Sequence, residues 1–509
     1  MATQDNLPIM VSRIGIIGAG VSGLAVVKQL SHYNPIVFEA TDSIGGVWRH
    51  CSSKCTKLQS PTCNYEFSDF PWPERESSEH PSYVEILEYL RAYAVYFDLF
   101  KYVMFNYKVV EIKFVRDKEG FDFGCLPPDH GNPLPGRMVW ELFVQTNESY
   151  VIQRYHFEFI VVCTGKYGDI PLMPKFPYNK GPEVFKGKAL HTIEYCKLDN
   201  ESTTDLVKGK KVVVIGFKKS ATDIAMECAQ ENQGPEGKPC TMIVRRLHWI
   251  LPHFWIWGVP FFMFYSTRSA QFLHQTPNQG LLKTLVRFLL SPMRRVISKF
   301  IESYLLWKLP LEKYGLKPDH SFEEDYASCQ VAVLPKSFYN EADKGKIIFK
   351  RASKWWFWSN GIEFDDNTKM DKLKTLLPEP FSSLLEYPSG IMPLYRGTIY
   401  PSIPNMAFVG YVESVSNLYT SEIRSMWLAG LIDNKFKLPS AEKMLLQTMK
   451  DMEAMKKSTK FYKKNCITTF SINHNDEICE DLGWHTWRKK NLIKEVFTPY
   501  TAVDYKKED

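Results

Sequence analysis

Three glycines near the start of the chain lie at a spacing that suits the binding of a dinucleotide. Gly18, Gly20 and Gly23 form a G-x-G-x-x-G motif directly after the apolar run 13–17, and Glu39 ends the next apolar run. In such a unit the first glycine permits a sharp turn, the second lets the backbone approach a pyrophosphate, and the third lets helix and strand pack closely. A carboxylate at the end of the second strand accepts a hydrogen bond from a ribose hydroxyl. The pattern predicts a dinucleotide site.

A second glycine pair indicates which dinucleotide this first site holds. Gly45 and Gly46, followed by Val47 and Trp48, come shortly after the carboxylate. Flavoproteins that bind two dinucleotides place a glycine pair at this spacing, along the flavin nucleotide. We therefore expect FAD rather than NAD here, with Gly46 and Trp48 close to it.

A second nucleotide-binding pattern follows far along the chain. After the apolar run 211–215 comes Gly216, and then Lys218 stands where such motifs normally have their middle glycine. A side chain there should hinder close approach of the backbone to a phosphate. We hypothesise that Lys218 and Lys219, next to Ser220 at the start of the following helix, bind the phosphates as cations. The simpler alternative is that one lysine points to solvent.

Two arginines follow the next strand of this second unit. Arg245 and Arg246 come directly after the apolar run 241–244. An arginine at this point can bind the 2′-phosphate, which favours NADPH over NADH. We expect at least one of the two arginines to be an ordinary surface residue.

Two dinucleotide units in one chain predict an α/β fold with two Rossmann-like, three-layer domains. We expect an NADPH-binding domain at residues 206–331, inserted into an FAD-binding domain formed by residues 1–205 and 332–509. A capping box at Ser82 and Glu85 predicts a helix that runs to about residue 97. Apolar runs predict strands at 109–115, 138–146 and 157–163.

The composition argues against several classes of protein. The net charge is +6 over 509 residues without a concentrated basic arm, so no nucleic-acid partner is expected. The 11 cysteines are dispersed and lack a paired C-x-x-C, so no metal site is expected. This cysteine pattern also indicates reduced thiols in a cytoplasmic protein. The N-terminal segment has no secretory signal.

One stretch leaves the question of membranes open. No segment has the roughly 20 uninterrupted apolar residues that span a bilayer. Residues 281–311 are apolar with basic side chains interspersed, namely Arg287, Arg294, Arg295 and Lys299. This stretch could lie on a membrane surface, or it could form a buried helix pair under a substrate site. The chain ends in Lys-Lys-Glu-Asp, which matches a di-lysine retrieval signal of the endoplasmic reticulum, although a solvated tail is simpler.

Further motifs give the chain a recognisable resemblance. Besides the nucleotide motifs, they are Phe67–Pro73, Cys163–Tyr167, Phe408–Tyr411 and the F-x-G-x-x-x-H-x-x-x-Y pattern of Phe185–Tyr195. Along nearly its whole length the chain resembles the plant flavin-containing monooxygenases. Three segments resemble most closely the branch that N-hydroxylates pipecolic acid to make an immune signal: Thr56–Ser60, His320–Gln330 and Tyr395–Thr398.

The resemblance implies a mechanism and a class of substrate. NADPH would reduce FAD, O2 would form a C4a-hydroperoxide on the reduced flavin, and a soft nucleophile would take up the distal oxygen. The substrate would be a small secondary amine such as pipecolate, and the product would act in plant defence signalling and systemic acquired resistance. The cofactors would be FAD and NADPH.

The resemblance also implies roles for two single residues. Gln59 aligns with an asparagine that many relatives place near the flavin C4a, and its longer arm can donate the same amide hydrogen bond. The alternative is that Gln59 is an incidental loop residue. His191 would lie in a linker close to the cofactors, where we expect a structural or gating role.

The chain departs from the family after the aromatic segment Trp355–Trp358. Relatives then have a strand that ends in Ala-Thr-Gly-Tyr and returns the chain to the FAD domain. Here Gly361–Thr368 runs directly into Lys369–Lys374, so this strand is missing. Neighbours of a lost strand lose ladder hydrogen bonds and packing. Two alternatives to an active monooxygenase therefore stay open: a catalytically impaired homologue, and an uncoupled NADPH oxidase that releases peroxide.

Overall fold

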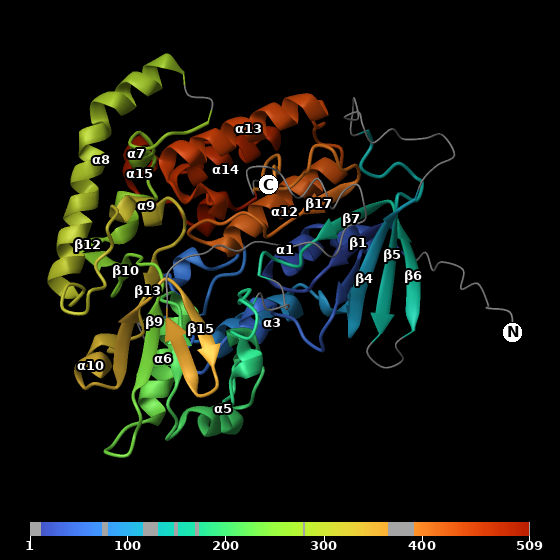
Figure 1. The fold of residues 1–509 in the computed structure, drawn as a ribbon. Coiled ribbons are helices and arrows are strands. Elements are labelled where there is room, and N and C mark those ends of the chain that lie inside the picture. Colours follow the sequence, from blue (N-terminus) through green and yellow to red (C-terminus); the bar gives the residue numbers. More distant parts are fainter. Residues whose placement is uncertain are drawn as a thin grey trace, which may run out of the picture.

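Two parallel sheets organise the chain. The structure, a computed structural model, describes residues 12–73, 80–115, 131–146, 151–167, 173–277, 280–364 and 391–507. One sheet lies at the right of Figure 1 and the other at its lower left, with helices packed against both. The predicted α/β fold with two Rossmann-like units is confirmed.

The first sheet has five parallel strands in the order β17-β7-β1-β2-β3. They are β1 (Ile14–Ile17), β2 (Ile36–Glu39), β3 (Val103–Phe105), β7 (Phe159–Val162) and β17 (Met406–Phe408). Such short, continuously apolar strands are typical of parallel sheets that are buried on both faces. The strands predicted at 13–17, 35–39 and 157–163 are therefore confirmed.

Two further layers enclose this sheet. Helices α1 (Val21–Gln29), α3 (Tyr83–Tyr96) and α12 (Asn417–Ile432) pack in one apolar cluster with β1. On the other face, an antiparallel meander of β4 (Tyr107–Phe114), β5 (Trp140–Thr146) and β6 (Ile152–Phe157) packs Trp140 and Phe157 against the sheet. The predicted capping box opens α3, where Ser82 accepts from the Glu85 amide. The first domain has the expected three layers.

The second sheet has three parallel strands in the order β14-β9-β8. They are β8 (Val213–Ile215), β9 (Cys240–Val244) and β14 (Ile347–Arg351), and they pack against α6 (Lys219–Glu231) and α10 (Phe338–Asp343). Because β14 pairs with β9, this unit extends beyond residue 331, the predicted end of the NADPH domain. The sequence did not predict that β14 belongs to this sheet, because pairing with a strand about 100 residues away leaves no local signal.

Strand β8 lies at the edge of the second sheet. Within the described part of the chain it pairs with β9 alone. Its first residue, Val213, is 43% exposed. The family strand that the sequence lacks would follow β16 (Gly361–Phe364), which pairs with β15 (Trp355–Trp358). The segment between β16 and residue 391 lies outside the described residues.

Smaller elements join the two sheets. In the second unit these are α4 (Thr192–Cys196), α5 (Asn200–Val207), α7 (Arg268–Gln271), α9 (Phe322–Tyr326), β10 (Ile250–Leu251), β11 (Trp255–Ile256), β12 (Val259–Pro260) and β13 (Ala332–Val333). The C-terminal part adds α13 (Ala441–Ser458) and α14 (Ser471–Asp481), which lie at the top of the molecule in Figure 1, and α15 (Leu492–Phe497), which lies beside α7. The short helix α2 (Val47–His50) follows the second glycine pair.

The apolar stretch 281–311 forms one long helix rather than a buried pair. Helix α8 (Leu281–Lys308) runs along the outer left edge of the molecule and projects above it (Figure 1). The expected buried helix pair is therefore wrong, because one side of α8 is exposed along its length. Every helix among the described residues is too short or too polar to cross a bilayer.

Two cysteines correct the expectation of reduced thiols. Cys329, just after α9, and Cys466, after α13, form a disulfide across a sequence separation of 137 residues. The prediction failed because the fold, rather than sequence spacing, brings these two positions together. The bond ties the second unit to the C-terminal helices.

Candidate cofactor-binding site

The first glycine turn tolerates no side chain at two of its positions. Gly18 has a φ of +101°, and a Cβ there would lie 2.8 Å from the carbonyl oxygen of Cys163. A Cβ on Gly23 would lie 1.9 Å from the Gly18 carbonyl oxygen. The turn and the start of α1 are thus pressed against the ends of β1 and β7. This is the close helix–strand contact predicted for Gly23.

The two glycine motifs of the first domain meet. Gly46 has a φ of +54°, and a Cβ on it would lie 3.1 Å from the Cα of Gly20. The amide of Gly45 donates to the Ala19 carbonyl at 3.2 Å. Since Gly20 is the N-cap of α1, two side-chain-free segments line the space beside the helix N-terminus, which is where phosphates bind favourably. Trp48 extends from this edge and donates from Nε1 to the Tyr65 hydroxyl.

Glu39 lies where the sequence predicts, at the end of β2, and it also shapes the turn. One carboxylate oxygen accepts from the Ala19 amide at 2.8 Å, and the other accepts from the Thr41 amide at 3.0 Å. The side chain is buried. Its hold on Ala19, inside the glycine turn, is a second role that sequence spacing alone did not indicate.

A glycine from a distant part of the chain also lies against the start of α1. Gly410 follows β17 with a φ of +93°, and a Cβ there would lie 2.4 Å from the Ser22 hydroxyl of α1. Ser22 is also 3.1 Å from the Ser421 hydroxyl of α12. In the sequence, Phe408–Tyr411 is recognisable only as a family motif. Its closeness to α1 could not be foreseen, because almost 400 residues separate the two segments.

The second nucleotide turn separates its two lysines. Gly216 has a φ of +135°, and Lys218 is the N-cap of α6. Lys219 pairs with the buried Asp223 one turn along the helix, whereas Lys218 donates from Nζ to the Gln330 side chain at 2.7 Å. Ser220 is exposed in the first turn. Burial, together with the nearby Lys464, lowers the pKa of Lys218 to about 8.

The arginines after β9 are exposed. Neither Arg245 nor Arg246 forms an ion pair within the described part of the chain. Partial burial, and then the neighbouring charge of Arg246, lower the pKa of Arg245. Both side chains are therefore available at the end of β9, where the sequence predicts the 2′-phosphate.

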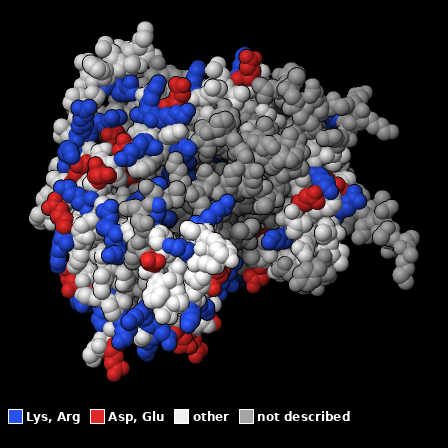
Figure 2. Space-filling model, in the orientation of Figure 1, with Lys and Arg blue, Asp and Glu red and all other residues white. Residues whose placement is uncertain are grey.

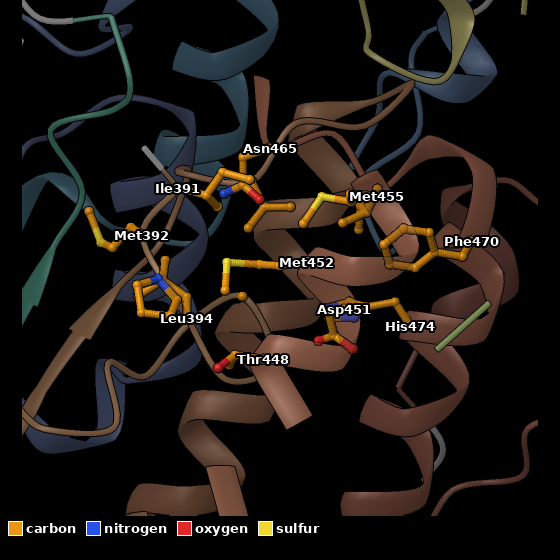
Figure 3. A pocket seen from close by; sticks show the side chains of 14 residues that line it. Ile391, Met392, Leu394, Thr448, Asp451, Met452, Met455, Asn465, Phe470 and His474 are labelled. Atoms are coloured by element: carbon orange, nitrogen blue, oxygen red, sulfur yellow. The ribbon is translucent and has the colours of Figure 1, made fainter. Parts of the chain in front are cut away.

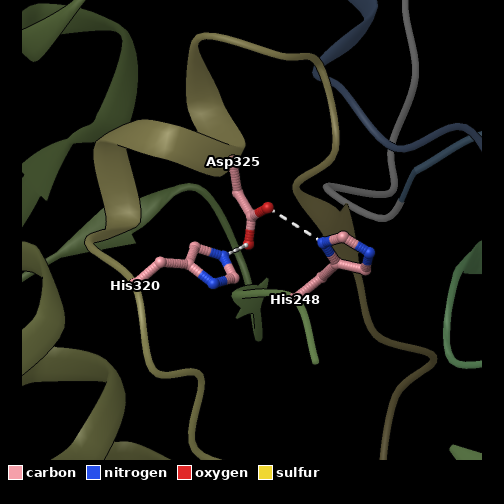
Figure 4. Close-up of side chains that lie close together, drawn as sticks. All are labelled: His248, His320 and Asp325. Carbon is pink, nitrogen blue, oxygen red and sulfur yellow. Dashed lines mark hydrogen bonds and ion pairs between the residues drawn. The ribbon is translucent and has the colours of Figure 1, made fainter. Parts of the chain in front are cut away.

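A buried carboxylate fixes the segment that follows these arginines. Asp325 of α9 lies 2.9 Å from His248 Nδ1, 2.9 Å from His320 Nε2, and accepts from the Trp249 amide at 2.7 Å (Figure 4). Although burial opposes it, these hydrogen bonds hold the pKa of Asp325 below its usual range. The three side chains lie close enough together to suggest a metal site. The short N–O distances and the backbone donor favour a hydrogen-bonded network that anchors the loop after β9.

Gln59 lies at a contact between the two units. Its Oε1 accepts from the Val333 amide of β13 at 3.0 Å. The side-chain Nε2 remains as a donor. The proposed hydrogen bond to the flavin stays a prediction, and the observed bond shows in addition that Gln59 fixes the first domain against the second.

The F-x-G-x-x-x-H-x-x-x-Y segment packs against α6 and the β15 hairpin. His191 caps α4, where its Nδ1 accepts from the Ile193 amide at 3.2 Å. Tyr195 donates to Glu227 of α6 at 2.8 Å, and Phe185 packs on Phe357 of β15. His191 thus has a helix-capping contact of its own, and its structural or gating role close to the cofactors stays a prediction.

One cavity of the described structure lies away from the glycine turns. It opens between α13 and α14 and is lined mostly by apolar side chains, with Asp451 and His474 among them (Figure 3). None of the residues predicted to bind a cofactor or to act in catalysis lines it, although Gly397 of the Tyr395–Thr398 segment does. We therefore assign the cofactor sites from the glycine turns, whose backbones approach one another at the carboxyl ends of the strands, as expected for this type of sheet.

Comparison with known proteins decides the family. The model of the flavin-binding monooxygenase-like family matches residues 11–499. The chain belongs to this family. It is 58% identical to the "Probable flavin-containing monooxygenase 1" of Arabidopsis thaliana, over 97% of this chain and 96% of that protein. It is 53% identical to the "Putative flavin-containing monooxygenase 2" of the same plant, over 93% and 97% of the two chains.

Solved structures share the fold of this monooxygenase. Cyclohexanone monooxygenase from Rhodococcus sp. Phi1, bound to NADP+, superposes with a TM-score of 0.64 at 16% identity, over 94% of this chain and 98% of that one. The OTEMO complex with FAD and NADP gives a TM-score of 0.60 at 17% identity, over 97% and 96%. The cofactors of the present monooxygenase are FAD and NADPH.

The residues present fit these cofactors. Gly18, Gly20 and Gly46 leave bare backbone at the N-terminus of α1, where the FAD pyrophosphate would bind, and Lys218 at the N-terminus of α6 would supply a cation for NADPH. FAD, when bound, accepts hydride from NADPH and passes electrons to O2. The protein's part is to bind and orient both nucleotides and to keep the reacting edge dry.

Proposed function

We propose that this monooxygenase hydroxylates the nitrogen of a small cyclic secondary amine of the pipecolate type, and that the product acts in plant defence signalling. One atom of O2 would enter the amine as a hydroxylamine oxygen and the other would leave as water, with NADPH as the reductant. The proposal is supported by the three segments that resemble the pipecolate branch. A cytoplasmic location, or one at the endoplasmic reticulum, is part of the same proposal.

The positions of two of these segments carry the argument. Thr56–Ser60 contains Gln59, which bonds across the domain contact to Val333. His320–Gln330 contains Asp325, which anchors the loop after β9, and Gln330, which holds Lys218. Residues of these segments thus lie at the contact between the two units and beside the second nucleotide turn, where they can affect which substrate is oxidised.

The first experiment is the visible spectrum of the purified chain before and after anaerobic addition of NADPH. Flavin bands that bleach are expected if both sites bind their nucleotides. Turnover of pipecolate under 18O2 should then give a hydroxylamine with one labelled oxygen, measured by mass spectrometry. Flavin reduction without any labelled product from secondary amines would contradict N-hydroxylation.

A matched pair of glycine variants checks the assignment of the flavin site. Gly23→Ala places a Cβ at 1.9 Å from a carbonyl oxygen and should abolish flavin binding. Gly280→Ala, at a position with nothing within 4 Å of the added carbon, should leave it unchanged. Flavin retained in both variants would place the cofactor elsewhere.

A second candidate function is an uncoupled NADPH oxidase. It is favoured by β8, which is an edge strand of the second sheet among the described residues and begins with the exposed Val213. Looser binding of the nicotinamide nucleotide would let O2 be reduced to peroxide. NADPH consumption with stoichiometric peroxide, and no change when an amine is added, would identify this activity.

A further inference from the structure

Helix α8 exposes a continuous apolar face. Its outward side chains recur at intervals of three and four residues, which places them on one side of the helix. Leu281 and Phe288 are 92% and 73% exposed. The other large apolar residues that α8 exposes are Leu282, Leu285, Leu289, Met293, Val296, Phe300 and Trp307. A patch of this length is uncommon on a monomer and marks a binding surface.

The opposite face of α8 already has its partners. Ile301, Tyr304 and Leu305 are buried in the core of the second unit. Glu302 accepts from the Phe322 amide at 3.0 Å and from Ser298. Folding of the second unit therefore accounts for the inner face of the helix and leaves the outer face without a structural purpose.

Aromatic side chains continue the patch at the C-terminal end of the helix. Trp307 stacks on Trp257 with ring centroids 4.8 Å apart, and both rings are exposed. Trp255, on the neighbouring β11, is also exposed. Tryptophan is enriched where proteins meet the headgroup region of a bilayer.

The exposed charged side chains of α8 are cations. Arg295 is exposed beside the apolar side chains, and Lys308 is exposed at the end of the helix. Lys299 is also exposed, but its ammonium group pairs with the single acid of the helix, the buried Glu302, at 2.6 Å. Figure 2 shows an uncharged tip at the upper left, where α8 projects, and an adjoining surface on which lysines and arginines are interspersed with acidic side chains.

We propose that α8 docks on the surface of an anionic membrane. Its apolar face would enter the boundary between headgroups and acyl chains while the flanking cations meet lipid phosphates, as interfacial helices do. The helix would lie in the surface and not cross it. A second copy of the chain is a poorer occupant, because a symmetric pairing of two α8 helices would bring their cationic flanks together.

Vesicle co-sedimentation tests this directly, with phosphatidylcholine alone and with phosphatidylcholine mixed with phosphatidylserine. The chain should bind the anionic vesicles more tightly than the neutral ones, and added salt should weaken the binding. Leu285→Asp should reduce binding by roughly tenfold or more, the value of one buried leucine side chain. Leu446→Asp is the control, since Leu446 on α13 is 56% exposed and Leu285 is 55% exposed.

Charge and assembly are tested separately. Arg295→Gln combined with Lys308→Gln should remove the preference for anionic lipid but leave residual binding to neutral vesicles. Thermal unfolding of each variant excludes misfolding as the cause. Equal loss in Leu285→Asp and Leu446→Asp, absence of binding, or a dimer by light scattering that Leu285→Asp dissociates would each overturn the proposal. None of these measurements depends on catalytic activity.

Discussion

Lys218 carries the most specific consequence for cofactor binding. Its ammonium group bonds to the neutral Gln330 side chain, whereas the charge of Lys219 is matched by Asp223. Because burial lowers the pKa of Lys218 to about 8, its charge is lost as the pH rises through 8. The Michaelis constant for NADPH should therefore rise above pH 8. Steady-state kinetics across pH 6.5–9.5 would measure this.

Two variants separate the lysines. Lys218→Gln should raise the NADPH Michaelis constant at pH 7 by about tenfold, the loss of one charge-assisted hydrogen bond, and should remove the pH dependence. Lys219→Gln should have a smaller effect because Asp223 already neutralises that charge. Equal Michaelis constants in both variants and the parent chain would contradict phosphate binding by these lysines.

Glu422 should make the free energy of unfolding depend on pH. This residue of α12 is buried and accepts from the amide and hydroxyl of Ser68 at 2.8 and 3.0 Å. Burial raises its pKa to about 8. A carboxyl whose pKa is raised on folding stabilises the protein fully below its unfolded pKa, and this stabilisation is lost as the pH rises through 8.

The expected result is a free energy of unfolding that falls between pH 5 and pH 8. Glu422→Gln, which stays neutral, should flatten this dependence and be more stable than the parent chain above pH 8. Chemical denaturation at several pH values measures it. A parent chain whose stability rises over this interval, with no difference in the variant, would show that Glu422 is ionised in the folded protein.

Strand β8 forms an apolar edge of the second sheet among the described residues. An apolar edge strand presents unpaired amides and carbonyls that can pair with another chain. Val213→Lys should therefore reduce aggregation during heating, because a lysine on an edge blocks such pairing. Light scattering during a thermal ramp measures the effect, and the NADPH Michaelis constant serves as the control. Unchanged aggregation would mean that the β8 edge is covered.

What the sequence could predict follows from distance along the chain. The glycine turn, the carboxylate of Glu39 and the capping box of α3 are local patterns, and each lies where the sequence places it. Gly410, Asp325 and Gln330 were not foreseen as site residues, because they reach their partners only through the packing of remote elements. The single helix α8 was ambiguous because an amphipathic pattern does not tell which face is covered.

The disulfide acts on the molecule as a whole. Cys329 follows α9 in the second unit, and Cys466 lies beside Glu413 and the C-terminal helices, so the bond links two parts that the chain joins only through many intervening residues. Closing a loop of this length restrains the unfolded chain by roughly 4–5 kcal/mol in the chain-entropy model. The bond also lies next to Gln330, the partner of Lys218.

Reduction with dithiothreitol should therefore lower the melting temperature of the parent chain, and Cys329→Ser combined with Cys466→Ser should lower it to the same extent without a reductant. Cys63→Ser, which removes an exposed free thiol, is the matched control and should melt like the parent chain. Because Gln330 is the neighbour of Cys329, reduction should also raise the NADPH Michaelis constant while leaving the flavin spectrum unchanged. A double variant that melts like the parent chain and still responds to dithiothreitol would show that the two thiols stay apart in the folded protein.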